Sequence, residues 1–152
     1  MAPITMNLVK TALTASGAAT TVGSGTMYYA IKGKAYTLAL MSGTATPTTD
    51  INTGSAFTAL AVLTGSVFLF GLNAAGDLKV AQGTVQALDV NEKFVLAPQF
   101  PAMPADFCPI AYITVKVGSS GSAWTFGSSN WNATDVVLVI QDIVGLPERP
   151  QV

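Results

Sequence analysis

The residues that most often carry enzyme chemistry are sparse in this chain. It contains no histidine, which removes the commonest general acid or base near neutral pH and the commonest metal ligand. Two carboxylate pairs, Asp142 with Glu148 and Asp89 with Glu92, offer the residue types that glycosidases use. Each pair flanks a predicted turn, where local hydrogen bonds favour Asp and its neighbours, so we interpret both pairs as solvated turn residues.

The single cysteine is the remaining candidate for covalent chemistry. Cys108 lies between Phe107 and Pro109, a setting that favours a small buried apolar side chain over a reactive thiol. The sequence has no GxSxG, P-loop or CxxC motif, and residues 48–52 approach a calcium loop only weakly. We therefore expect a protein that is not an enzyme and that holds no cofactor and no metal ion.

Aromatic side chains form a second kind of candidate site. The segment AWTFGSSNW at 123–131 sets Trp124 and Trp131 in a polar Gly/Ser loop, where they would anchor a partner or a carbohydrate. The alternative is that these rings close the open end of a β-sandwich. Both interpretations remain open at this point.

Four of the eight prolines lie in PQFPAMPADFCPI at 98–110, interleaved with apolar residues. Proline presets an extended backbone and lowers the entropy lost on ordering, so this segment is suited to lie across a surface. We expect Phe107 and Cys108 to belong to the chain's own fold, and Phe100 and Met103 to contact a neighbour. The predicted interface residues are therefore Phe100, Met103, Trp124 and Trp131.

Charge is scarce along the whole chain. Only 10% of its 152 residues are charged and the net charge is −1, so nothing indicates a nucleic-acid partner. Half of the residues are hydrophobic, which favours a surface covered by neighbouring copies or by a larger assembly. The uncharged stretch 51–76 is apolar enough to consider a membrane span, but Thr64, Gly65 and Ser66 interrupt it and we expect a strand instead. The N-terminal residues lack the pattern of a secretory signal.

Short extended patterns separated by Gly, Ser, Thr and Pro recur from residue 27 onward. They predict strands in six segments: 27–31 and 35–40 about a Lys32-Gly33 turn, 66–72 and 77–85 as a second hairpin, 112–117 and 135–144. Helices at 56–63 and 87–94 are the only others considered, and neither pattern is convincing. The sequence thus predicts an all-β protein, a single β-sandwich or jelly-roll-like domain at 26–145, with residues 1–25 as an extended arm or edge strand and 146–152 as a C-terminal tail.

Alternation predicts which strand residues face the core. In YITVKV at 112–117, we expect the residues Ile113, Val115 and Val117 to point inward, and Tyr112, Thr114 and Lys116 to point outward. The continuous apolar run at 135–144 is suited to a strand buried on both faces, or to one that a partner half covers.

From about residue 66 onward the chain resembles virion proteins of tailed bacteriophages. The resemblance is carried by FGLNAAGDLKVAQGTV (70–85), by APQFPAMPADFCPIAYITVKVGSSGSAWTFGSSNWNATDV (97–136) and by GLPERPQ (145–151). It implies a capsid decoration, or cement, protein: a small β-sandwich that sits on the outside of the head and bridges capsomers. The family has no catalytic residues to carry over.

The resemblance also implies partners and a location. The partners would be the major capsid protein and further copies of this chain, as a homotrimer or alternatively a dimer, with no nucleic acid and no membrane. The location would be the outer capsid surface of the virion, after synthesis in the host cytoplasm. Two alternatives remain: another phage component (tail, baseplate or head-fibre base), or a carbohydrate-binding module that uses the Trp124–Trp131 loop.

Overall fold

The structure is a computed structural model that describes residues 3–17 and 19–151, and it is all-β, as predicted. No helix occurs within these described residues. The strands, in chain order, are β1 (Met6–Asn7), β2 (Thr21–Val22), β3 (Met27–Ile31), β4 (Lys34–Leu38), β5 (Thr44–Ala45), β6 (Thr64–Leu72), β7 (Leu78–Gln82), β8 (Gln86–Ala87), β9 (Cys108–Val117) and β10 (Val136–Asp142).

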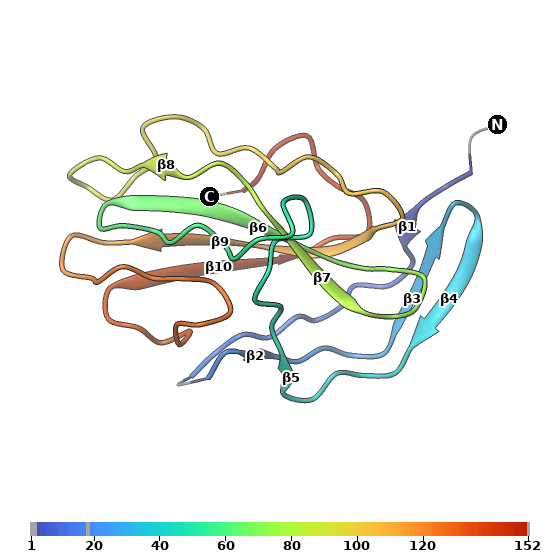
Figure 1. Ribbon diagram of the computed structural model, residues 1–152. Coiled ribbons are helices and arrows are strands. Elements are labelled where there is room, and N and C mark those ends of the chain that lie inside the picture. The colour runs from blue at the N-terminus through green and yellow to red at the C-terminus, as the bar shows by residue number, and fades with distance from the viewer. Residues whose placement is uncertain (1–2, 18, 152) are drawn as a thin grey trace.

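The strands form a β-sandwich in which one sheet is much larger than the other parts. The large sheet has the order β10-β9-β6-β7, and β8 pairs with the start of β6. A sheet of order β1-β3-β4 and a short β2-β5 ribbon make up the second layer. In Figure 1 the strands β2, β3, β4 and β5 lie below and to the right of the large sheet. Every named strand pair is antiparallel.

The two layers share one hydrophobic core. It joins second-layer residues such as Met27 and Tyr29 to large-sheet residues such as Phe68 and Ile113, all of them almost fully buried. The aromatic rings interlock, with those of Phe68 and Phe126 stacked at 4.6 Å between centroids. Each such ring removes a large apolar area from water, which stabilises the sandwich against the entropy cost of ordering the chain.

The first hairpin forms where the sequence predicts it. Lys32 and Gly33 connect β3 to β4 with φ angles of 49° and 79°. Two successive positive φ values define the type I′ turn, whose twist matches that of the flanking strands. The second predicted hairpin, β6 to β7, is also present; Asn73 Oδ1 accepts hydrogen bonds from the backbone N–H groups of Ala75 and Asp77 in its turn.

The second face of the large sheet is covered as well, although the alternation along residues 112–117 predicts a solvent-facing side. Tyr112 and Thr114 point away from the first core, but each is only 1% exposed, so the prediction that they face solvent is wrong. The cover consists of residues 94–107, here called the strap, and residues 146–151, here called the tail. Phe107 of the strap joins a second buried cluster, which also contains Val67, Leu69, Tyr112 and Ile143.

Two glycines of β6 give the strap access to the sheet. A Cβ at Gly65 would lie 2.7 Å from Cζ of Phe94, and a Cβ at Gly71 would overlap the ring of Phe107. Glycine within a strand often marks such a close approach. The strap is therefore held by two aromatic rings that lie against bare backbone, with Val67 and Leu69 buried between them.

The N-terminal segment lies on the chain's own fold. β1 pairs with β3, and β2 pairs with β5. Asn7 is fully buried, and its Nδ2 donates hydrogen bonds of 3.1 Å to Thr11 Oγ1 and to the Ile143 carbonyl. The Leu13 N–H donates to Asp142 Oδ1 at 2.9 Å. These contacts make residues 3–17 and 19–25 a part of the second layer, so of the two sequence interpretations the edge strand describes them and a free arm does not.

The last strand differs from its prediction. β10 pairs with β9 but stands at the end of the sheet, and no other strand of the described chain pairs with its outer edge. One face of β10 packs against the core through Val136, Leu138 and Ile140. Val137 on the other face is 44% exposed, so the prediction of a strand buried on both faces was wrong. The segments 56–63 and 87–94 are not helical. Within the described residues no helix has the length and apolar character needed to cross a membrane.

Replacing Gly71 with alanine is expected to destabilise the protein, because the new methyl group would overlap the Phe107 ring. Overpacking of this kind lowers the free energy of unfolding by about 1–3 kcal/mol. Gly145→Ala is the matched control, since a Cβ there meets no atom within 4 Å. Urea unfolding measures both variants. A Gly71→Ala variant as stable as the control would contradict the docking of Phe107 on β6.

The isosteric change Asn7→Asp is expected to loosen the N-terminal segment. A carboxylate cannot donate to Ile143 O and Thr11 Oγ1, and a buried unpaired charge costs about 3 kcal/mol at pH 7. Burial raises the folded-state pKa of the new carboxyl above its unfolded value of about 3.9, so the loss appears as pH rises above that value and fades below it.

The control is Asn132→Asp, at an exposed side chain. Denaturant unfolding at pH 7 and at acidic pH gives the comparison. Equal stability of Asn7→Asp and the control at pH 7 would mean that water reaches residue 7 and that the segment is not docked.

Candidate functional site

The four predicted interface residues divide into two pairs. Phe100 and Met103 lie together in the strap, on the outside of the large sheet. Phe100 is half-buried, with its ring edge-to-face on Tyr112 at 5.0 Å between centroids, and Met103 is 45% exposed. Trp124 and Trp131 belong to the core on the other side of that sheet. Phe107 and Cys108 are buried in the chain's own fold, as predicted.

The two tryptophans are not available to a partner. Their exposed fractions are 1% for Trp124 and 3% for Trp131, and their rings lie 5.7 Å apart. Trp124 Nε1 donates to the Asn130 carbonyl and Trp131 Nε1 to the Thr21 carbonyl, both at 2.9 Å. A carbohydrate platform or an interface anchor needs exposed ring area, so the prediction of an interface role for these residues is wrong. Burial supports the alternative, that they close the sandwich core.

The strap and the tail form one continuous surface, here called the strap–tail face. The Gln151 N–H donates to the Tyr112 hydroxyl at 2.8 Å, and Thr114 Oγ1 donates to the Gln151 carbonyl at 3.5 Å. These bonds hold the tail beside the strap and satisfy two hydroxyls that alternation had assigned to solvent. Five of the chain's eight prolines lie in these two segments: Pro98, Pro101, Pro104, Pro147 and Pro150.

Two adjoining grooves run between strap and tail. The first, of about 690 Å³, is bounded by residues 97–100 and 146–149. The second, of about 550 Å³, shares Ala97, Pro98 and Arg149 with the first. Its remaining lining residues are Lys93, Phe94, Lys116 and Pro150. Prolines stand in both walls, and the bonds of Gln151 to Tyr112 and Thr114 hold the tail wall, so the single chain forms the grooves by itself.

The strap–tail face exposes apolar side chains. Val95 is 62% exposed, Leu96 64% and Met103 45%. Such side chains gain free energy when a partner covers them, at about 25 cal/mol per Å² of apolar area removed from water. Sequence reasoning found Met103 but missed Val95, Leu96 and the tail. The two prolines of GLPERPQ were the available signal for the tail.

The second groove concentrates positive charge and is here called the basic groove. Its cations are Lys93, Lys116 and Arg149. These are three of the seven Lys and Arg residues of the chain. The structure describes no ion pair for any of them; its two ion pairs are Lys32–Asp106 and Lys79–Asp77. Lys116 Nζ donates to the Glu92 carbonyl at 3.3 Å, which orients the ammonium without neutralising it.

An ion pair connects the strap to the first hairpin. Lys32 Nζ, in the β3–β4 turn, lies 2.6 Å from Asp106 Oδ1, with both side chains about two-thirds exposed. An exposed pair of this kind contributes at most about 1 kcal/mol. It therefore orients the end of the strap but does not by itself hold it down.

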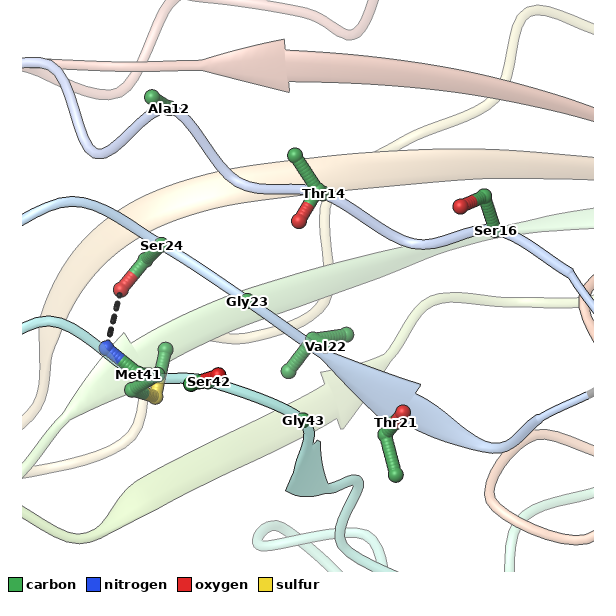
Figure 2. A pocket seen from close by; sticks show the side chains of 10 residues that line it. All are labelled: Ala12, Thr14, Ser16, Thr21, Val22, Gly23, Ser24, Met41, Ser42 and Gly43. Carbon is green, nitrogen blue, oxygen red and sulfur yellow. Dashed lines mark hydrogen bonds between the residues drawn. The ribbon is translucent and has the colours of Figure 1, made fainter.

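A separate groove lies in the second layer. Figure 2 shows it between residues 12–16, 21–24 and 41–43, with the hydrogen bond from the Met41 N–H to Ser24 Oγ drawn dashed. Its volume is about 380 Å³. Its lining offers hydroxyls and backbone groups but no titratable side chain, so its lining has no group for acid–base chemistry.

The residues considered for chemistry have structural surroundings. Burial raises the pKa of Cys108 to about 11, which keeps its thiol neutral. The backbone N–H of Lys93, and then that of Asn91, hold the pKa of Asp89 below its usual value, because both donate to Asp89 Oδ1. Within residues 3–17 and 19–151, no group of three His, Cys, Asp or Glu side chains is arranged to hold a metal ion.

Comparison with known proteins adds nothing to this geometry: neither a family model, nor a curated protein, nor a solved structure matches the chain. The resemblance to phage virion proteins therefore stays a prediction.

Tryptophan fluorescence tests the assignment of both indoles to the core. The emission of the folded protein is expected at short wavelength, and acrylamide should quench it far less than it quenches the urea-unfolded chain. Trp124→Phe and Trp131→Phe single variants separate the two contributions. Strong quenching of either tryptophan in the folded state would restore it as a surface residue.

Proposed function

We propose that the protein is a non-enzymatic virion structural protein of a tailed bacteriophage, a decoration protein that binds the outer surface of the head and bridges capsomers. Its partners are the major capsid protein and other copies of itself. The strap–tail face is the surface that meets the shell.

One observation carries this proposal. The stretches that carry the resemblance, at 97–136 and 145–151, include strap residues 97–107 and the tail, and these two segments lie side by side on one face. That face combines exposed apolar side chains, such as Val95 and Met103, with proline-stiffened backbone. A stiff extended surface loses little conformational entropy when it docks, so broad contact gives affinity without a deep pocket.

The alternatives differ in how well they fit. A tail, baseplate or head-fibre component would use the same kind of surface, so only its place in the virion separates it from a decoration protein. The carbohydrate-binding alternative depended on the Trp124–Trp131 loop, and both rings are buried. A role outside catalysis agrees with a buried neutral thiol and with carboxylates that accept backbone hydrogen bonds, Asp89 within its turn and Asp142 from the Leu13 N–H.

Binding to purified heads tests the proposal. Met103→Asp and Leu96→Asp are expected to weaken head binding at least tenfold, about 1.4 kcal/mol, because each sets an unpaired charge in an apolar contact. Leu40→Asp is the matched control, an equally exposed leucine at 61% in the second layer. Cosedimentation of labelled protein with heads, and separately with isolated tails, gives both measurements.

Two results would contradict the proposal. Binding to tails and not to heads would identify another virion component. Head binding that is lost in Leu40→Asp but kept in both strap variants would mean that the shell contacts the second layer.

A further inference from the structure

The turn at Asp89–Glu92 presents an apolar side chain to solvent on a rigid support. Val90 is 88% exposed, the highest value among the exposed large hydrophobic residues. Asp89 Oδ1 accepts from the N–H groups of Asn91 and Lys93 at 2.8 and 2.9 Å, and the Asp89 N–H donates to the Lys93 carbonyl at 2.8 Å. The turn is therefore ordered although the Val90 side chain at its tip is almost fully exposed.

The far side of the turn is also anchored. Glu92 Oε1 accepts a hydrogen bond of 3.0 Å from the Ser119 N–H, and the Glu92 carbonyl accepts from Lys116 Nζ. A turn held at both ends loses little freedom on binding, so burying Val90 would translate efficiently into affinity. The turn also carries negative charge, because the pKa of the half-buried Asp89 is held below its usual value and its carboxyl is ionised at neutral pH.

The basic groove has the complementary character. Phe94, Pro98 and Pro150 give it apolar walls, and Lys93, Lys116 and Arg149 give it positive charge. An apolar tip flanked by a carboxylate matches such a groove in both respects. Charge complementarity of this kind sets the register of an interface and disfavours wrong partners.

We infer that the protein self-associates as a two-fold dimer in which the 89–92 turn of each copy occupies the basic groove of the other. The turn and the groove are neighbours, since Lys93 both closes the turn and lines the groove. A two-fold axis beside them makes both contacts at once, which is the usual reciprocal arrangement of homodimers. This geometry favours a dimer over the homotrimer that the family resemblance implies. It goes beyond the proposed function, because it requires no shell.

A charge-swap experiment on the isolated protein tests the inference. Val90→Lys sets a positive charge on the turn and repels the native groove. The double variant Lys93→Glu, Arg149→Glu makes the groove acidic and repels the native turn. Sedimentation-equilibrium measurements over a concentration series should show dimers for the wild type and an association constant at least tenfold lower for each variant alone. In the mixture both reciprocal contacts become attractive, so dimers should return.

The controls repeat these changes away from the turn and groove. Leu40→Lys and the double variant Lys10→Glu, Lys34→Glu make the same changes of charge at exposed residues that do not line the basic groove, and both should dimerise like the wild type. Near-UV circular dichroism verifies that each variant is folded. Should Val90→Lys not fold, Val90→Ser, which removes the apolar contact without adding charge, replaces it, and dimerisation should again weaken.

Three results would overturn the inference: a wild type that is monomeric at roughly millimolar concentration, undiminished dimers in either charge variant, or no recovery in the mixture. A monomer whose head binding depends on Lys93 and Arg149 would instead assign the groove to an acidic segment of the shell. Head binding is measured separately through Met103 and Leu96, so the dimer and the decoration role can fail independently.

Discussion

The structure depends on how the second face of its central strands is covered. β6 and β9 are apolar on both sides, and the second layer of the sandwich covers only one of them. The strap supplies the missing cover by laying Phe94 and Phe107 against the bare backbone of Gly65 and Gly71. Without these contacts Val67, Leu69 and Tyr112 would face water, at a cost of about 1.5–3 kcal/mol for each large side chain.

The docked strap determines what the molecule can present to a partner. Strap residues 98–104 pair with no strand of the described chain, so prolines that would break a ladder are tolerated there and instead keep the backbone extended. The Tyr112 hydroxyl, buried beneath, reaches Gln151 and fixes the tail beside the strap. The proposed contact surface is therefore a by-product of core formation: the residues that cover the sheet also fix the exposed side chains around them.

The sequence predicted the elements that local chemistry determines. The Lys32-Gly33 turn, the β6–β7 hairpin and the burial of Phe107 and Cys108 follow from turn residues and short apolar patterns. The prediction that Tyr112 and Thr114 face solvent was wrong. Alternation places their hydroxyl-bearing side chains on the polar side of the strand, but Gln151, nearly forty residues away, provides hydrogen-bond partners for both hydroxyls inside the fold. Gly65 and Gly71 were the overlooked signal, since isolated glycines in an apolar strand mark a close approach.

The prediction that Trp124 and Trp131 lie at an interface was wrong for a related reason. A Gly/Ser-rich loop predicts exposure, but each indole N–H finds a backbone carbonyl, one of them on the remote residue Thr21. Of the candidate site, only Phe100 and Met103 lay within reach of sequence reasoning. The basic groove was not, because Lys93, Lys116 and Arg149 meet only after the chain has folded.

Proton NMR offers the most direct test of the central claim, that the strap covers its own sheet. Aromatic ring currents shift nearby protons strongly, so the α-protons of Gly65 and Gly71 should resonate well upfield of ordinary strand glycines. Phe94→Leu should remove the shift at Gly65 alone, and Phe107→Leu the shift at Gly71 alone. Ordinary glycine shifts at both positions in the folded wild type would contradict the account.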